Sequence, residues 1–115
     1  MKVVYVAGPY RAKDYNRRQR NITLAREVAL MLWVAGFAAL CPHSNSAHFD
    51  GAAPDEVFLK GSLEMLRRSD AVVMMPGWEK SEGSVAERDA AMLMNIPVFE
   101  FPEFPDEALK SRRLS

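Results

Sequence analysis

Short apolar runs alternate with longer stretches of helical periodicity along this chain. The runs span residues 2–7, 37–41, 71–75 and 97–99. Their length and hydrophobic character are typical of strands that are buried on both faces of a parallel sheet. Between the runs, apolar residues recur at helical spacing over residues 17–35, 56–68 and 85–94. The alternation predicts an α/β fold in which helices cover a parallel sheet.

The order of these elements predicts a flavodoxin-like or Rossmann-like three-layer sandwich with a parallel sheet of four to five strands. Right-handed crossovers place helices on both faces of such a sheet, and we expect the strand order 2-1-3-4. Open α/β sheets bind ligands beyond the carboxyl ends of their strands, at the switch point between strands 1 and 3. Residues 8–11 and 77–84, which follow those two strands, are therefore the expected walls of a ligand site.

Length and composition are those of a soluble globular domain. We expect this domain to span residues 1–100, with residues 101–115 forming a C-terminal tail or a short helix. The formal net charge is zero, so no global field attracts a nucleic acid polymer or a membrane. A single cysteine, Cys41, excludes an intrachain disulfide and fits a reducing, cytoplasmic location. No apolar stretch is long enough to span a bilayer.

The first predicted helix carries an unusually wide apolar stripe. One row consists of Ile22, Ala25, Ala29 and Leu32, and a second row beside it consists of Leu24, Val28, Met31 and Ala35. A stripe of this width suits a helix that packs on a sheet and also on a second subunit. We therefore expect a homo-oligomer, either a dimer or a tetramer.

Positive charge is concentrated in the N-terminal third of the chain. The residues are Arg11, Lys13, Arg17, Arg18, Arg20 and Arg26. They form either a solvated helix face or a phosphate site. Arg11 lies nearest the switch point, and a guanidinium can bind a phosphate through two parallel hydrogen bonds.

The sequence Ser81-Glu-Gly-Ser84 lies at the start of the third predicted helix. Backbone N–H groups and the helix dipole at such a position favour an anion, and Gly83 lets the anion approach closely. An ordinary N-cap formed by Ser81 or Ser84 explains the same residues. The stretch lacks the glycine patterns of dinucleotide or nucleoside triphosphate sites.

Two further side chains indicate glycosyl chemistry. Tyr5 stands in an aliphatic strand, and its hydroxyl group needs a partner if the ring is buried. Glu87 lies near the start of the third predicted helix. A carboxylate near an anion site suits attack at an anomeric carbon, because it stabilises or traps an oxocarbenium-like centre. Asp70 is not an expected second carboxylate, because it begins the third strand and falls at the opposite end of the sheet.

The chain resembles the nucleoside 2-deoxyribosyltransferase-like superfamily over roughly residues 3–100. The stretches that carry the resemblance are Val4-Tyr5-Val6-Ala7-Gly8-Pro9-Tyr10, Leu63-Glu-Met-Leu-Arg-Arg-Ser-Asp-Ala-Val-Val73 and Pro76-Gly-Trp-Glu-Lys-Ser-Glu-Gly83, with Glu87 and Ala91. It looks closest to a small uncharacterised branch and is similar to the 2′-deoxynucleoside 5′-phosphate N-hydrolases. The resemblance implies cleavage of an N-glycosidic bond through a glutamate nucleophile, without a metal or an organic cofactor.

By position, the resemblance assigns roles to individual residues. Glu87 matches the nucleophile, and Tyr5 matches a tyrosine beside it. Ser81 matches a serine that binds the 5′-phosphate. The expected substrate-binding residues are Gly8, Pro9, Tyr10, Arg11, Ser62, Gly77, Trp78, Ser81 and Gly83. Trp78 could stack on the base or cover the cleft, although an exposed loop position or an oligomer contact explains it equally well.

Two residues depart from the family pattern. The family usually has an aspartate that contacts the sugar where this chain has Ser62, and a glycine where this chain has Asp89. A serine can hydrogen-bond a hydroxyl group, but it supplies neither the charge nor the base. Asp55, two turns earlier on the same helix face, would be a partial substitute.

We expect this protein to hydrolyse the N-glycosidic bond of a (deoxy)nucleoside 5′-monophosphate. A nucleoside 2-deoxyribosyltransferase is the neighbouring alternative within the same chemistry. A nucleotide-binding module with impaired catalysis is the alternative that the two departures favour, and an interaction domain with a vestigial cleft is a third. If the protein is a hydrolase or a transferase, its expected partner is a small-molecule nucleoside or nucleotide.

Overall fold

The computed structural model describes residues 1–9, 15–41, 55–103 and 105. Four parallel strands form one sheet: β1 (Val3–Ala7), β2 (Ala38–Leu40), β3 (Ala71–Met74) and β4 (Val98–Glu100). Their order across the sheet is β2-β1-β3-β4. Each neighbouring pair is parallel. The predicted fold class and strand order are therefore confirmed.

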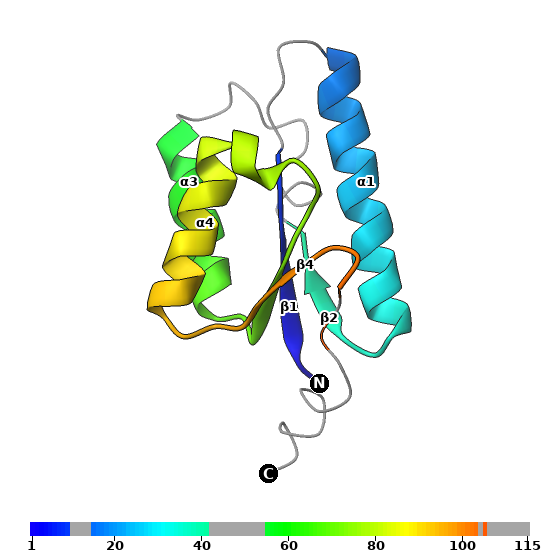
Figure 1. Cartoon of the computed structure of the whole chain (residues 1–115), viewed down its shortest axis with the longest axis vertical. Helices are drawn as coiled ribbons and strands as arrows, with labels where there is room; N and C mark the ends of the chain where they lie inside the picture. The colour runs from blue at the N-terminus through cyan, green and yellow to red at the C-terminus, as the bar shows by residue number, and fades with distance from the viewer. Residues whose placement is uncertain (10–14, 42–54, 104, 106–115) are drawn as a thin grey trace.

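Helices cover both faces of this sheet (Figure 1). They are α1 (Tyr15–Val34), α3 (Asp55–Arg67) and α4 (Glu82–Leu93), with a short 3₁₀ helix, η1 (Trp78–Lys80), before α4. Of the helices that the structure describes, α1 covers one face, whereas α3 and α4 contact each other on the opposite face. The result is a three-layer sandwich.

Successive side chains of β1 point to opposite faces of the sheet, so they contribute to two separate cores. Val4 and Val6 belong to the core beneath α1, whereas Tyr5 and Ala7 belong to the core beneath α3 and α4. All four of these side chains are buried. The hydroxyl group of Tyr5 is thus enclosed beneath the pair of helices that also carries Glu87.

The two predicted stripes on α1 mostly serve this chain's own core. The first row is buried, and in the second row Val28 is buried while Leu24 and Ala35 pack against the core. Met31 is the exception, with 46% of its surface exposed. The stripe therefore gives less support to an oligomer than we expected.

Several element boundaries differ from the predictions. Helix α4 begins at Glu82 rather than Val85, because Ser81 caps it. Helix α3 begins at Asp55, one residue before the predicted start. Within the apolar pattern of residues 56–68, Leu59 is 40% exposed, whereas Leu66 is fully buried. Met75 falls just beyond β3, although it is buried as expected.

Asp70 lies at the amino end of the sheet, as predicted. Its Oδ2 accepts a hydrogen bond of 2.7 Å from the backbone N–H of Val3. Most of the expected tail lies outside the described residues, but Phe101 packs against the core beneath α1. None of the helices in the described part of the chain is both long and apolar enough to cross a membrane.

Candidate functional site

The loops that follow β1 and β3 meet at the predicted switch point. A Cβ atom placed on Gly8 would lie 2.7 Å from the Cβ of Met75, and one placed on Gly77 would lie 3.6 Å from the Cγ of Pro9. Gly77 also has a φ of +87°, in the left-handed region that favours glycine. Gly8 therefore has a packing role, because no side chain fits between β1 and Met75.

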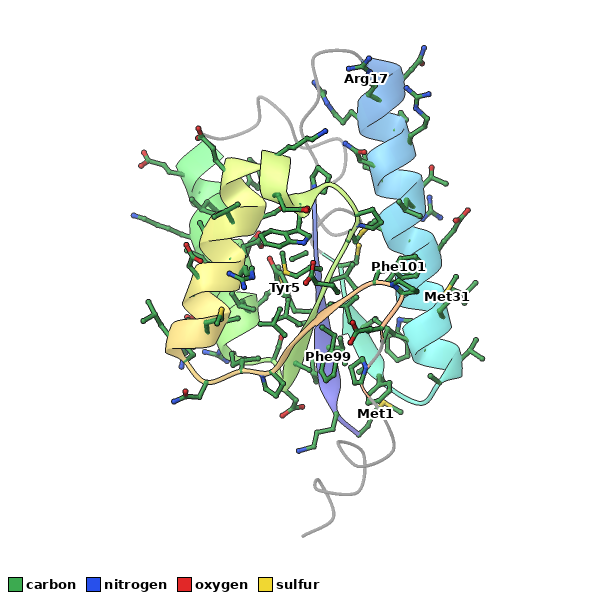
Figure 2. The ribbon with its side chains drawn as sticks, in the orientation of Figure 1. Met1, Tyr5, Arg17, Met31, Phe99 and Phe101 are labelled. Atoms are coloured by element: carbon green, nitrogen blue, oxygen red, sulfur yellow. The ribbon has the colours of Figure 1, made fainter. Side chains whose placement is uncertain are left out.

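Tyr5 and Glu87 meet beneath α3 and α4. The hydroxyl group of Tyr5 donates a hydrogen bond to Oε2 of Glu87, across 82 residues of sequence. Tyr5 is fully buried and Glu87 is 8% exposed. Tyr5 is labelled in Figure 2, in the core between the sheet and these helices. The structure thus brings together the two side chains that were predicted to carry the chemistry.

Burial changes the acidity of both groups. It raises the pKa of Glu87 to about 7 from an ordinary value of 4.5, and the hydrogen bond from Tyr5 opposes part of that rise. Burial is also the largest cause of a raised pKa at Tyr5, followed by the charge of Glu87. Near neutral pH Tyr5 is therefore a proton donor in a hydrogen bond and not an acid, while Glu87 is partly ionised.

Ser62 also belongs to this cluster. It is half-buried on α3, one turn before the fully buried Leu66 and on the same helix face. Its presence lowers the pKa of Tyr5, against the larger effect of burial. The resemblance implied only a sugar-contacting position for Ser62 and did not indicate its effect on Tyr5.

The start of α4 is built by two serines. Ser81 is the N-cap, and its Oγ accepts hydrogen bonds from the backbone N–H of Ser84 at 3.3 Å and from the Ser84 hydroxyl at 3.1 Å. Ser84 is buried. No atom lies within 4 Å of a Cβ placed on Gly83, so the space beside it is open. Ser84 was not among the predicted site residues, although the Ser-x-x-Ser spacing at a helix start was the signal for it.

Trp78 is half-buried rather than an exposed loop residue. Its Nε1 donates to Oε1 of Glu100 at 3.0 Å, and the guanidinium of Arg88 lies 5.1 Å from the ring centroid. The ring also packs against the core that contains Tyr5. These contacts occupy the indole N–H and cover one face of the ring.

A hollow of about 390 Å³ lies between α4 and β4. Its lining residues are Arg88, Met92, Ile96, Val98, Glu100 and Glu103. None of the predicted site residues lines this hollow. In the described part of the chain, no three His, Cys, Asp or Glu side chains are grouped so that they could hold a metal ion.

Two of the predicted binding residues, Tyr10 and Arg11, lie outside the described residues. Asp89 points to solvent, with 63% of its side chain exposed and its Oδ1 3.8 Å from Arg88. This departure from the family pattern therefore adds a surface charge and does not alter the surroundings of Glu87.

Comparison with solved structures identifies 2-deoxyribosyltransferases of similar fold. The enzyme from Bacillus psychrosaccharolyticus has a TM-score of 0.61 and 17% sequence identity, over 95% of this chain and 80% of that chain. The enzyme from Leishmania mexicana has a TM-score of 0.63 and 18% identity, over 88% of this chain and 64% of its own length. The present chain thus has the nucleoside 2-deoxyribosyltransferase-like fold.

Sequence comparison places the chain more narrowly. No curated protein matches it significantly. One family model matches residues 2–100, which include all the strands and helices described above. The chain therefore belongs to the family described as Domain of unknown function (DUF4406).

Proposed function

We propose that this protein hydrolyses the N-glycosidic bond of a (deoxy)nucleoside 5′-monophosphate, with Glu87 as the nucleophile. The observation that carries the proposal is the hydrogen bond from Tyr5 to the buried carboxylate of Glu87. A carboxylate that is held in place and largely removed from water is pre-organised for attack on a sugar carbon.

The hydrogen bond also selects the attacking atom. Tyr5 donates to Oε2, so we expect Oε1 of ionised Glu87 to form the bond to C1′. The C1′–N bond breaks in the same step, and the base departs with the bonding electron pair. Water then attacks C1′ and frees the carboxylate, and the proton that water loses neutralises the departed base, in the covalent order of retaining glycosidases.

The start of α4 supplies the candidate phosphate site. Ser81 lies six residues before Glu87, which corresponds to about 9 Å along a helix axis, the scale of one sugar-phosphate unit. The Ser81 hydroxyl accepts the cap bonds described above, and its own proton can be donated to a phosphate oxygen. The open space beside Gly83 lets an anion approach the first backbone N–H groups of the helix.

Alanine at Gly83 provides a test of this phosphate site. Gly61 in α3 is the matched control, because a Cβ atom added to either glycine would meet no other atom within 4 Å. Each substitution should stabilise the fold by up to about 1 kcal/mol, since alanine favours a helix over glycine. We expect only Gly83→Ala to raise the KM for a nucleoside monophosphate, by about tenfold. Equal KM values for the two variants would contradict the phosphate site.

Product analysis tests the reaction itself. The protein is incubated with each deoxynucleoside 5′-monophosphate and each deoxynucleoside, and free base is separated by chromatography. Hydrolysis predicts release of free base and sugar phosphate from the monophosphates. No release from any of them would contradict the proposal.

Base exchange is the second candidate activity, because both similar structures described above are 2-deoxyribosyltransferases. It shares the glycosyl-enzyme step, but the acceptor is a second base in place of water. The same incubation with an added acceptor base distinguishes hydrolysis from base exchange, because only base exchange forms a new nucleoside or nucleotide. Saturable nucleotide binding without release of any base would instead indicate a catalytically impaired binding module.

We also propose that the chain forms a homo-oligomer through the C-terminal half of α1. Leu30, Met31, Trp33 and Val34 are 63%, 46%, 52% and 81% exposed. They follow one another within two turns of the helix, so they form a contiguous apolar surface of the kind that marks protein contacts. Light scattering should give the mass of a dimer or tetramer for the wild type and a smaller mass for Val34→Glu.

A further inference from the structure

We propose that Trp78 is a positioning residue that holds the loop between β3 and α4, and with it Ser81, through a hydrogen bond to Glu100 at the end of β4. This role differs from stacking on the base, which the sequence also allows for this tryptophan. The part of the inference that concerns substrate binding rests on the proposed function, whereas the anchor itself is a property of the folded protein.

Two neighbouring elements hold the indole ring of Trp78. Its Nε1 donates to Oε1 of Glu100 on β4 at 3.0 Å, and the guanidinium of Arg88 on α4 lies 5.1 Å from the ring centroid. The ring is half-buried and packs against the core that contains Tyr5. An indole has one hydrogen-bond donor and no acceptor, and a cation over its face adds to the attraction. The polar edge of the ring and one of its faces are therefore already engaged within the protein.

The backbone of Trp78 connects the end of β3 with the start of α4. Its N–H donates to the oxygen of Met75 at 3.2 Å, and its oxygen accepts a bond of 3.1 Å from the N–H of Ser81. Ser81 is both the residue that ends η1 and the N-cap of α4. A displacement of Trp78 would therefore be transmitted directly to Ser81.

The rest of this loop has little buried surface of its own. Among residues 76–80 Trp78 is half-buried, whereas the other four are exposed. A 3₁₀ helix as short as η1 also has poor hydrogen-bond geometry. Segments with few buried contacts open at a low cost in free energy. The side chain of Trp78 is therefore the main contact that fixes the position of the loop.

Ser81 needs such support, because its own cap bond is long. The distance from the backbone N–H of Ser84 to the Ser81 Oγ is 3.3 Å, beyond the usual range for this kind of bond. The orientation of Ser81 thus depends on its backbone, which Trp78 holds from the preceding turn. We infer that the Trp78 anchor keeps the Ser81 hydroxyl in the place where substrate binding requires it.

The test is the coupling between the two partners of the bond. Glu100→Ala and Trp78→Phe each remove one partner, and phenylalanine keeps an aromatic ring for packing. Each should raise the KM for a deoxynucleoside 5′-monophosphate about fivefold, the worth of one hydrogen bond, with kcat unchanged. The double variant should also show about a fivefold rise and not about 25-fold, because both changes break the same bond. Glu100→Gln keeps an acceptor oxygen and should stay within about twofold of the wild type.

Glu103→Ala is the matched control for Glu100→Ala. Glu103 is exposed and lines the same hollow. Its backbone N–H donates to the backbone oxygen of Glu100 at 2.8 Å, and alanine keeps this bond. The control should therefore have the KM of the wild type.

A second readout needs no substrate. It is the indole N–H signal of Trp78 in proton–nitrogen NMR, assigned from the signal that Trp78→Phe removes. Glu100→Ala should move this signal and the backbone amide signal of Ser81, because the loop loses its anchor. Glu103→Ala should leave both signals close to their positions in the wild type.

The outcomes separate this inference from the proposed function. If Glu100→Ala leaves the indole signal or the Ser81 amide signal unmoved, the anchor is overturned, whether or not the protein releases base. If the wild type releases no base, the hydrolase is contradicted, and the dissociation constant of the monophosphate replaces KM with the same expected ratios. Effects that multiply in the double variant, or a loss in Trp78→Phe that Glu100→Ala does not share, would make Trp78 a substrate contact and overturn the positioning role.

Discussion

Replacement of Glu87 by glutamine is expected to lower base release by about three orders of magnitude or more. The amide oxygen can still accept the hydrogen bond from Tyr5, so the geometry of the cluster should be kept. What the variant loses is the negative oxygen that forms the bond to C1′. Chromatography of free base from a deoxynucleoside monophosphate, with wild type and Glu87→Gln side by side, measures the effect.

The control for this experiment is the same chemical change at an exposed position. Glu27→Gln lies on α1, which covers the opposite face of the sheet, and should release base at the wild-type rate. Full activity in Glu87→Gln would show that another group attacks the sugar. Unchanged nucleotide affinity in Glu87→Gln, together with no base release by the wild type, would favour the binding module over the enzyme.

The strands and their order were predictable because their sequence signal is strong. Strands β1 and β3 lie at the centre of the sheet and are covered on both faces, so nearly every position is apolar. Glycine and proline directly after them mark where they end. Right-handed crossovers then leave few arrangements, and the switch point follows from the order.

The contact between Tyr5 and Glu87 was predictable only in part. A lone tyrosine in a buried aliphatic strand needs a partner, but periodicity does not say which residue that is. The resemblance supplied Glu87 as the partner. Which side of α3 faces Tyr5 depends on how this helix is rotated against the sheet, and that rotation is a property of packing that the helical pattern alone does not determine.

The second apolar row on α1 was predicted to contact another subunit, and this prediction was too broad. Leu24, Val28 and Ala35 of that row pack on the chain's own core. A sheet face is wider than the narrow seam between two helices, so it can cover two adjacent rows. The residues that remain exposed, such as Trp33 and Val34, could be separated from the others only once the position of α1 on the sheet was known.

The pH dependence of stability is expected to report the burial of Glu87 without any substrate. Its pKa is about 7 in the folded protein and 4.5 when exposed, so the folded state prefers the protonated form. The stability that this preference gives is fully present below about pH 4.5 and is lost as the pH rises through 7. The free energy of unfolding should fall by about 3 kcal/mol over this range because of Glu87.

Comparison of the wild type with Glu87→Gln isolates this contribution, because the other titrating groups are common to both. Urea unfolding at pH 5 and at pH 8 should show that the glutamine variant gains stability relative to the wild type by about 2 to 3 kcal/mol at the higher pH. Tyr5→Phe removes the donor that lowers the pKa of Glu87, so its stability should fall still more steeply with pH. A stability difference between the wild type and Glu87→Gln that is the same at both pH values would mean that the carboxylate is ionised at little cost. In that case Glu87 would be well solvated in the folded protein, and the sheltered position that suits it to attack a sugar carbon would be lost.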